Sequence, residues 1–342
     1  MNGLQWPRYG RIWLLLAATL SGCGGSQWPV YEAMQGSTMG TYYRVQYALS
    51  EACRPSQFAV EQQLIRFNQS LSTYIEDSEL SLLNRAPAQQ VSPISERLDL
   101  ALTAALELWR DTGGAFDVTV GPLVNLWGFG PTNAEETPTE FEQDAVAERI
   151  GMENLELASN SIEKKQPNLF IDLSAIAKGY AVDRVAEKLS SLGCKDYLVD
   201  IGGESFAKGQ NQAGTPWKIG IEVPSPERRG IQRVLALSDL AIATSGDYRN
   251  FRDTAVGRVS HVMDPRNKLP VTNNIVSATV LHRSAMMADA YATSMMVLGY
   301  EDGMKLAEAQ SFPVYLLLEE SGGRLEERYN DQMMEYLELD ND

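Results

Sequence analysis

The sequence predicts an α+β fold, built as a single domain of mixed strands and helices. Amphipathic helical segments such as residues 96–109 are interspersed with short apolar runs such as residues 197–201. The order does not follow the strict strand–helix–strand alternation that a doubly wound parallel sheet requires. The chain has 342 residues, which is enough for one large domain or for two closely packed subdomains, and both arrangements stay open.

The N-terminal residues are predicted to be a secretory signal. Arg8 and Arg11 precede an apolar stretch at residues 12–20. This stretch has the length of a signal-peptide core and is too short to span a bilayer. We therefore assign residues 1–22 to a signal peptide that is removed from the mature protein.

Cys23 is the predicted lipidation site. The residues Leu20-Ser21-Gly22 place small side chains directly before it, in the order typical of a bacterial lipobox. Acyl chains such as palmitate on this cysteine would anchor the protein, with residues 23–37 as a tether. We then expect a location in the bacterial periplasm, on the inner membrane in preference to the outer. The alternative is an ordinary secretory signal that contains a cysteine.

Composition excludes some functions. The net charge of −16 makes the chain a poor partner for nucleic acid or for an anionic membrane surface. Dinucleotide-binding GxGxxG, P-loop, HExxH and GxSxG motifs are absent from the sequence. The other cysteines, Cys53 and Cys194, have no metal-site or redox spacing, and the sequence does not decide between a disulfide and free thiols.

Hydrophobic periodicity predicts the elements in the first part of the chain. Residues 41–47 alternate as a strand does. Apolar side chains recur at helical spacing over residues 56–67 and again over residues 96–109. A β-rich run follows at residues 116–120.

The middle of the chain combines a polar segment with a strand and a helix. Residues 131–142 are polar and acidic, which indicates a surface excursion. Thr139 and Glu142 form a capping box that should open a helix reaching Ile150. Residues 168–173 are expected to be a strand that leads directly into a helix over residues 174–189.

The last part of the chain is predicted to be rich in strands. A Met- and Ala-rich helix is expected over residues 285–298. The domain would cover residues 38–318, followed by an acidic C-terminal segment, residues 319–342. The strands are expected at residues 197–201, 218–223, 234–237, 276–281 and 314–318.

Asp172, Ser174 and Lys178 form a first candidate site. Asp172 ends the predicted strand and Ser174 opens the helix, whose unpaired N–H groups favour anionic oxygens. Lys178, one turn later, would add positive charge near a bound phosphate. The alternative is a serine cap followed by a solvated lysine.

Asp289 and Thr293 form a second candidate site. They stand four residues apart on the predicted helix and so share a face. A carboxylate and a hydroxyl suit Mg²⁺, which binds oxygen ligands and ligand phosphates. The alternative is an aspartate that complements the helix dipole and an ordinary helical threonine.

The only histidines in the sequence are His261 and His282. Asp264-Pro265 marks a turn, so His261 should lie at a strand end, where catalytic side chains are often exposed. A structural role for His261 is the alternative. His282 has no motif around it, and we assign it a structural role.

Six segments stand out along the chain. They are MGT (39–41), STY (72–74) with SEL (78–80), GAFDVTVGPL (114–123), DLSAIAKGYAVD (172–183), SHVMDP (260–265) and, after the run TSGDY (244–248), ADAYAT (288–293). In this order they resemble the ApbE family of FAD:protein FMN transferases, and the resemblance covers nearly all of residues 38–318.

The resemblance implies a catalytic domain with FAD in its cleft and assigns residues to it. Metal ligands would be Asp289, Thr293 and the main-chain carbonyl of Ala175. Some relatives have other residues at Lys178 and Met263, so those two assignments are the least specific. The implied FAD contacts are Met39, Tyr74, Ala115, Phe116, Asp117, Asp172, Lys178 and Met263.

The resemblance also implies a reaction. A threonine hydroxyl of a target protein would attack the FMN-side phosphorus of FAD, so that AMP leaves and FMN stays attached through a phosphoester. Mg²⁺ would stabilise the phosphate charge, and His261 would accept the threonine proton. Family targets are subunits of flavin-dependent respiratory ion pumps with a Ser/Thr-rich acceptor motif.

Two other functions stay open from the sequence. One is an FAD pyrophosphatase that uses water as the nucleophile and releases FMN and AMP. The other is a non-catalytic lipoprotein that binds flavin or another solute, which would not require His261 or the pair Asp289 and Thr293.

Overall fold

The computed structural model describes residues 29–129, 137–225, 230–247, 251–254 and 257–337. The predicted signal peptide, residues 1–22, and the predicted lipidation site Cys23 lie outside these ranges. None of the helices within them combines the length and the apolar character that a bilayer-spanning helix needs.

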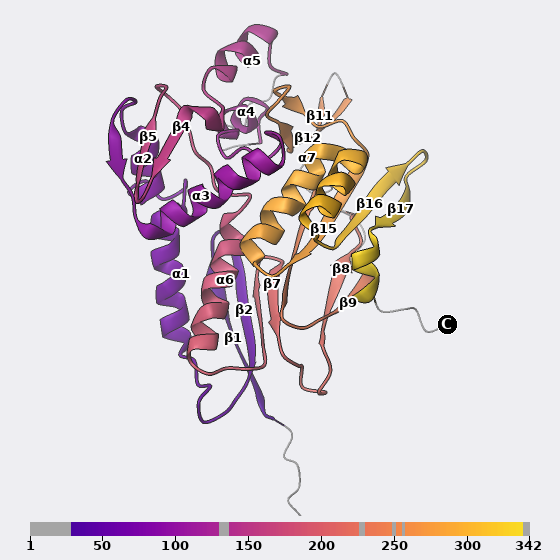
Figure 1. Ribbon diagram of the computed structural model, residues 1–342. Coiled ribbons are helices and arrows are strands. Elements are labelled where there is room, and N and C mark those ends of the chain that lie inside the picture. The colour runs from indigo at the N-terminus through magenta and orange to yellow at the C-terminus, as the bar shows by residue number, and fades with distance from the viewer. Residues whose placement is uncertain (1–28, 130–136, 226–229, 248–250, 255–256, 338–342) are drawn as a thin grey trace, which may run out of the picture.

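A single antiparallel sheet of eight strands forms the framework of the molecule (Figure 1). Each neighbouring pair in it is antiparallel. In spatial order the strands are β1 (Tyr31–Thr38), β2 (Thr41–Ala48), β6 (Tyr197–Ile201), β7 (Glu204–Lys208), β10 (Leu240–Gly246), β15 (Ile275–His282), β16 (Val314–Glu320) and β17 (Arg324–Tyr329).

Four long helices pack on one face of this sheet (Figure 1). They are α1 (Gln57–Leu71), α3 (Glu96–Asp111), α6 (Ala177–Ser191) and α7 (Ala285–Gln310). The main core lies between helices and sheet, with side chains such as Phe67, Leu102, Val182 and Met295 almost fully buried. Burial of this apolar surface is the main favourable contribution to folding.

The other face of the sheet carries a smaller core. A hairpin of β8 (Trp217–Glu222) and β9 (Ile231–Leu237) covers it, together with a 3₁₀ helix at Asp331–Glu335. Trp217, Leu235, Tyr315 and Met333 are buried there. The acidic segment after residue 318 therefore continues the sheet as β17 and contributes Met333 to this core. The prediction of one α+β domain is confirmed, since both cores share the same sheet.

Shorter elements surround the helical end of the domain (Figure 1). The helices are α2 (Glu79–Arg85), α4 (Gly121–Leu126), α5 (Glu140–Ala147) and a 3₁₀ turn at Met152–Asn154. The strands are β3 (Val91–Pro93), β4 (Leu155–Ala158), β5 (Ser161–Lys164), β11 (Phe251–Thr254), β12 (Gly257–Ser260), β13 (Met263–Asp264) and β14 (Leu269–Pro270).

Most of the predicted elements are found. The helix predicted over residues 96–109 is α3, and its apolar stripe is buried. The capping box of Thr139 and Glu142 is formed at the start of α5. In α1 the stripe is only partly right, because Leu64 is buried whereas Ile65 is 57% exposed.

The expected strand at residues 168–173 is wrong. The segment does not belong to a sheet, and its first residue, Asn168, lies in a turn with a φ of +62°. The side chain of Asn84 takes the place of a neighbouring strand: its amide donates to the Ile171 carbonyl at 2.8 Å, and its oxygen accepts from the Ile171 N–H at 2.8 Å. The helix that follows begins at Ala177, three residues later than predicted, because residues 174–176 form a turn.

The β-rich run at residues 116–120 is also not a strand. It forms turns between α3 and α4. The buried carboxylate of Asp117 accepts from the N–H and the hydroxyl of Thr119 and from the N–H of Met152 at 3.3 Å. These local hydrogen bonds compete with strand pairing, so the apolar composition misleads here.

Cys53 and Cys194 form a disulfide. Both are buried, and the bond joins the loop before α1 to the segment after α6 across 141 positions of sequence. The question that the sequence left open is thus settled in favour of pairing. A cross-link over a long loop restricts the unfolded chain and stabilises the fold by about 2–4 kcal/mol.

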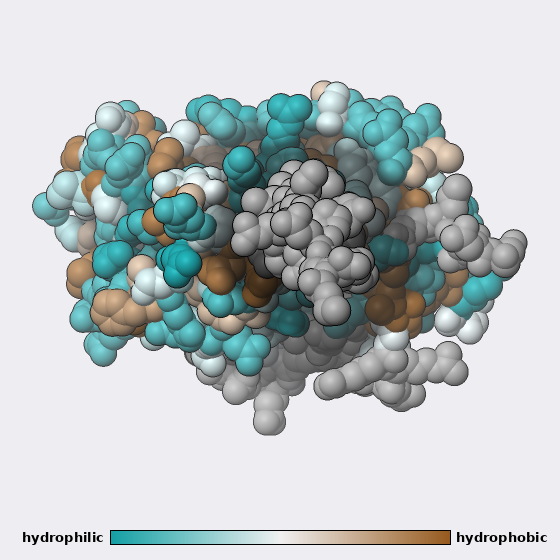
Figure 2. Space-filling model, turned by 90° about the horizontal axis from the view of Figure 1, so that it is seen from below, coloured by the Kyte–Doolittle hydropathy of each residue, from teal (hydrophilic) through white to brown (hydrophobic). Residues whose placement is uncertain are grey.

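The N-terminal start of the domain and the α4 region lie at opposite ends of the molecule. In Figure 1, β1 starts at the lower end, and α4 and β12 lie at the upper end. Figure 2 views the molecule from the lower end, where hydrophilic residues predominate and hydrophobic residues form separate patches. The described part of the chain therefore begins at the end of the molecule that is remote from α4.

Candidate functional site

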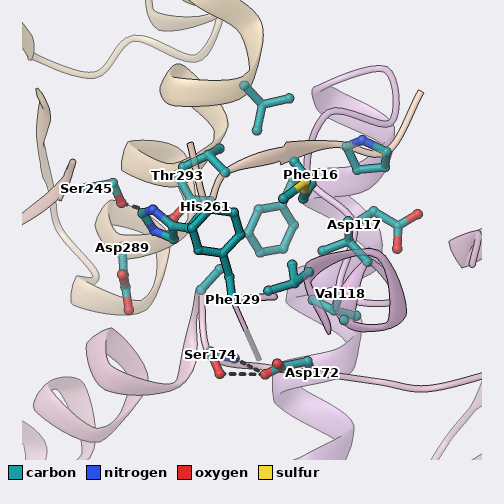
Figure 3. A pocket seen from close by; sticks show the side chains of 18 of the residues that line it. Phe116, Asp117, Val118, Phe129, Asp172, Ser174, Ser245, His261, Asp289 and Thr293 are labelled. Atoms are coloured by element: carbon teal, nitrogen blue, oxygen red, sulfur yellow. Dashed lines mark hydrogen bonds between the residues drawn. The ribbon is translucent and has the colours of Figure 1, made fainter. Parts of the chain in front are cut away.

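A cavity of about 570 Å³ lies where the α4 region meets α6, α7 and the sheet. Its volume lies in the range typical of cofactor sites. In Figure 3, His261, Ser245, Thr293 and Asp289 lie on one side of the view and Asp117 and Val118 on the other. The walls thus come from segments that are far apart in the sequence.

The structure brings nearly all the predicted site residues to this cavity. Met39 is the exception: it lies in the turn between β1 and β2, packs against the main core and does not line the cavity. Those that line it are Tyr74, Ala115, Phe116, Asp117, Asp172, Ala175, Lys178, His261, Met263, Asp289 and Thr293.

Aromatic side chains supply part of the cavity wall. Tyr74 is 83% exposed, so its ring is available to a planar ligand. Phe116 is buried, and its N–H donates to the Thr112 hydroxyl at 3.0 Å, which fixes the loop after α3. Phe129 completes this wall.

Asp117 and Asp172 use their carboxylates to hold the backbone. Burial raises the pKa of Asp117, against the hydrogen bonds from Thr119 and Met152. Asp172 accepts from the N–H of Ser174 at 2.9 Å and from its hydroxyl. Both side chains therefore shape the turns that face the cavity.

Helices α6 and α7 touch closely at the floor of the cavity. A Cβ atom at Gly179 would lie 2.1 Å from the Ala285 carbonyl oxygen, so only glycine fits. The Gly179 N–H donates to Asp289 Oδ2 at 3.0 Å. This contact fixes the carboxylate of Asp289, whose residue is only 3% exposed.

Three charged side chains meet at this floor. Lys178 Nζ donates to Glu204 Oε1 at 2.9 Å and lies 3.7 Å from Asp289 Oδ1. Burial raises the pKa of Glu204 to about 8, Asp289 adds to this rise, and Lys178 opposes it. Burial also raises the pKa of Asp289, against Lys178 and the Gly179 amide. Burial would lower the pKa of Lys178, but the charges of Asp289 and Glu204 raise it.

The predicted metal ligands fit a divalent cation. Two buried carboxyl groups share one ammonium, so ionising both leaves the cluster short of positive charge. Glu204 Oε2 is buried and has no hydrogen-bond partner within the described residues. Asp289, Thr293 and the main chain of Ala175 all line the same cavity and offer the oxygen donors that Mg²⁺ prefers.

Sequence reasoning missed Glu204 and Ser245, which also line the cavity. Ser245 Oγ lies 3.0 Å from Thr293 Oγ1, so the two hydroxyls share a hydrogen bond. Glu204 directly follows the turn of Gly202 and Gly203. An acidic residue beside two glycines was the available signal, but its partners Lys178 and Asp289 come from distant segments.

His261 directly follows β12 and lines the cavity. Its ring packs edge-on near Phe129, with ring centroids 6.2 Å apart. The predicted position at a strand end is therefore correct. Figure 3 shows the imidazole beside Ser245 and above Asp289.

Known proteins are similar to this chain in sequence. The sequence profile of the ApbE family matches residues 39–316. A Vibrio cholerae FAD:protein FMN transferase is 42% identical over 318 residues, covering 92% of this chain and 95% of the relative. The Escherichia coli K12 protein of the same name is 35% identical, covering 91% and 93%.

Solved structures agree with these relatives. The flavin transferase ApbE from Vibrio cholerae superposes with a TM-score of 0.83 at 40% identity, covering 90% of this chain and 100% of that one. The Pseudomonas stutzeri flavinyl transferase ApbE gives 0.81 at 34% identity, covering 90% and 96%.

The fold is that of the ApbE flavin transferases. The two transferases are 42% and 35% identical and cover 92% and 91% of this chain. The family profile matches residues 39–316. The chain belongs to the ApbE family.

Proposed function

We propose that this protein is an FAD:protein FMN transferase, which moves FMN from FAD to a threonine hydroxyl of a target protein and releases AMP. One observation carries the proposal: a single cavity combines an aromatic wall, a turn leading into a helix start, and a buried cluster of two carboxyl groups and an ammonium. The names of the relatives, FAD:protein FMN transferase, support the same reaction.

The residues divide the cavity between the two ends of FAD. Tyr74 and Phe116 offer rings against which a flat heterocycle can stack. The turn at residues 174–176 leads into α6, where the N–H groups of Ala177 and Gly179 already donate to the Leu173 carbonyl and to Asp289. The positive charge at this helix start would therefore come from Lys178 and from the helix dipole. The pyrophosphate would therefore lie between the aromatic wall and the start of α6. Met39 would act on FAD only indirectly, through the β1–β2 turn.

Mg²⁺ would be held by Asp289, Thr293 and the carbonyl of Ala175. When bound, it would neutralise the phosphate charge that develops as AMP leaves. The support in this chain is the buried Asp289 carboxylate, fixed by Gly179, and the Thr293 hydroxyl, fixed by Ser245.

His261 would accept the proton of the attacking threonine. An imidazole with an ordinary pKa near 6.5 suits a base at neutral pH. Its place on the cavity wall, on the same side as Thr293 and Asp289 in Figure 3, supports this role. The threonine oxygen then forms a bond to the FMN-side phosphorus as the bond to AMP breaks, so the phosphorus keeps its number of oxygens.

The test is mass spectrometry of a target subunit incubated with the protein, FAD and Mg²⁺. We expect the target to gain the mass of FMN less water on one threonine, with AMP released in equal amount. Removal of Mg²⁺ by a chelator should stop the reaction. Asp289→Ala should stop it as well, whereas Glu156→Gln, a change at an exposed ion pair, should not.

Each other outcome separates a competing function. Free FMN and AMP with no change in the mass of the target would identify a pyrophosphatase. Intact FAD after incubation with Mg²⁺ and target would identify a non-catalytic binding protein. Either result contradicts the proposed transferase.

We further propose that the protein works in the bacterial periplasm, anchored through lipidated Cys23 to the inner membrane. The disulfide between Cys53 and Cys194 supports an oxidising compartment, because such bonds persist there and are rare in the cytosol. The targets would be subunits of flavin-dependent respiratory ion pumps with a Ser/Thr acceptor motif. The acidic net charge of −16 argues against nucleic acid as a partner.

A further inference from the structure

Glu204 stands in the cavity floor without a role in the reaction described above. It is the first residue of β7, directly after the turn of Gly202 and Gly203. Both glycines have positive φ values, +65° and +110°, and the Gly203 N–H donates to Asp200 Oδ1 at 3.0 Å. The turn therefore holds Glu204 in a fixed position.

The contacts of Glu204 point toward the predicted metal ligand. Its Oε1 accepts from Lys178 Nζ at 2.9 Å, a normal charge-assisted hydrogen bond. The distance from the same Nζ to Asp289 Oδ1 is 3.7 Å, which is beyond hydrogen-bonding range. The ammonium is thus hydrogen-bonded to Glu204 and forms a longer ion pair, without a hydrogen bond, with Asp289.

This asymmetry has a consequence for Asp289. Its Oδ2 already accepts from the Gly179 N–H, so Oδ1 is the oxygen better available to a cation. An ammonium hydrogen-bonded to Oδ1 would compete with a metal for that oxygen. Glu204 prevents this competition by accepting the hydrogen bond of the ammonium, which leaves Lys178 and Asp289 with the longer ion pair of 3.7 Å.

We propose that Glu204 is a positioning residue for the metal site, which holds the Lys178 ammonium away from Asp289 so that Asp289 can bind Mg²⁺. The inference rests on the proposed function, since it concerns the same metal. Glu204 acts through Lys178 and does not touch the reacting atoms. Side chains that position a metal ligand typically change metal affinity by about 10- to 100-fold when replaced.

The test compares Mg²⁺ binding by isothermal titration in four proteins without FAD: wild type, Glu204→Gln, Lys178→Met and the double variant. The titrations are run at pH 9, where the Glu204 carboxyl is ionised, so that glutamine keeps the shape of the side chain and removes its charge. We expect Glu204→Gln to bind Mg²⁺ at least about tenfold more weakly. Lys178→Met should bind it no more weakly than wild type. The double variant should recover affinity, because the competing ammonium is gone.

A second readout separates positioning from a loss of structure. In the transfer assay, Glu204→Gln should need more Mg²⁺ for half-maximal rate and approach the wild-type rate at saturating Mg²⁺. Its melting temperature should match that of Glu156→Gln, whose side chain is exposed.

The outcomes that overturn the inference are distinct from failure of the proposed function. Wild-type affinity in Glu204→Gln, or a double variant as weak as Glu204→Gln alone, overturns the role of Glu204 and leaves the transferase standing. A wild-type protein that neither binds Mg²⁺ nor needs it for transfer overturns the metal assignment and this inference with it.

Discussion

At the residue scale, His261 carries the sharpest chemical expectation. His261→Ala should keep FAD and Mg²⁺ binding and lose FMN transfer by roughly 10² to 10⁴, the usual scale for a lost base. Single-turnover transfer at saturating FAD, with a melting curve of the same sample, measures both. Should His261 only support the Asp264-Pro265 turn, the variant would be less stable and its saturated rate would be normal.

His282 gives an expectation for the pH dependence of stability. Burial lowers its pKa, Arg283 adds to this, and its Nδ1 accepts from the Ser284 N–H at 3.0 Å. A histidine with a lowered folded-state pKa stabilises the fold while neutral, and this stability is lost as pH falls below the unfolded value near 6.5.

We therefore expect the wild type to lose more unfolding free energy between pH 8 and pH 5 than His282→Asn, in which an amide oxygen can accept from Ser284. Urea unfolding at a series of pH values measures this difference. Parallel pH profiles for the two proteins would show that His282 does not titrate with unfolding.

The sequence predicted most of the residues around the cavity but not what each side chain does there. Asp117 and Asp172 line the cavity, and the hydrogen bonds that their carboxylates accept from Thr119 and Ser174 were not predicted. Glu204 and Ser245 were missed, because their importance comes from Lys178 and Thr293, which only the fold brings near. Sequence spacing reveals pairs of residues that share one helix face. It does not reveal pairs that come together from separate elements.

At the element scale, the start of α7 depends on Asp183. The Asp183 carboxylate accepts from the Ser284 hydroxyl at 2.6 Å, the Ala285 N–H at 2.7 Å and the Met286 N–H at 3.0 Å. It therefore satisfies the free N–H groups at the start of the helix that carries Asp289.

Asp183→Ala should lower the free energy of unfolding by about 2 kcal/mol, since it removes a cap and leaves buried donors without acceptors. Asp302→Ala, which breaks an exposed ion pair with Lys305, should change it by less than about 0.5 kcal/mol. Chemical denaturation of both variants makes the comparison. Equal effects would mean that the Asp183 cap adds nothing to stability.

Elements with a strong period were predictable, and elements fixed by local side chains were not. The helix predicted to end at residue 298 stops being regular at Gly299, where φ is +77° and α7 kinks. Residues 168–173 have strand composition, but the amide of Asn84 satisfies their backbone in place of a strand. Hydrophobic periodicity indicates which face of an element is buried. It does not indicate that a side chain such as Asn84 will take the place of a neighbouring strand.

At the scale of the whole molecule, Cys23 and the folded domain should be separable. Cys23→Ala should move the protein from the membrane fraction to the soluble periplasmic fraction while FAD affinity stays the same, because the cavity is lined by α4, at the end of the molecule opposite the start of β1. Fractionation with an immunoblot, and flavin fluorescence on the purified variant, provide the measurements. A variant still held in the membrane fraction would contradict lipid anchoring at this residue.

With the proposed lipid anchor at Cys23, the position of β1 limits the distance between the folded domain and the bilayer. From Cys23 to Tyr31 the chain has eight residue steps, which span at most about 29 Å when fully extended. With the lipid at Cys23, the start of β1 stays within that radius of the membrane surface, and α4, which lines the cavity, lies at the opposite end of the molecule. We expect an enzyme anchored in this way to modify acceptor threonines that project into the periplasm more readily than threonines at the level of the lipid headgroups.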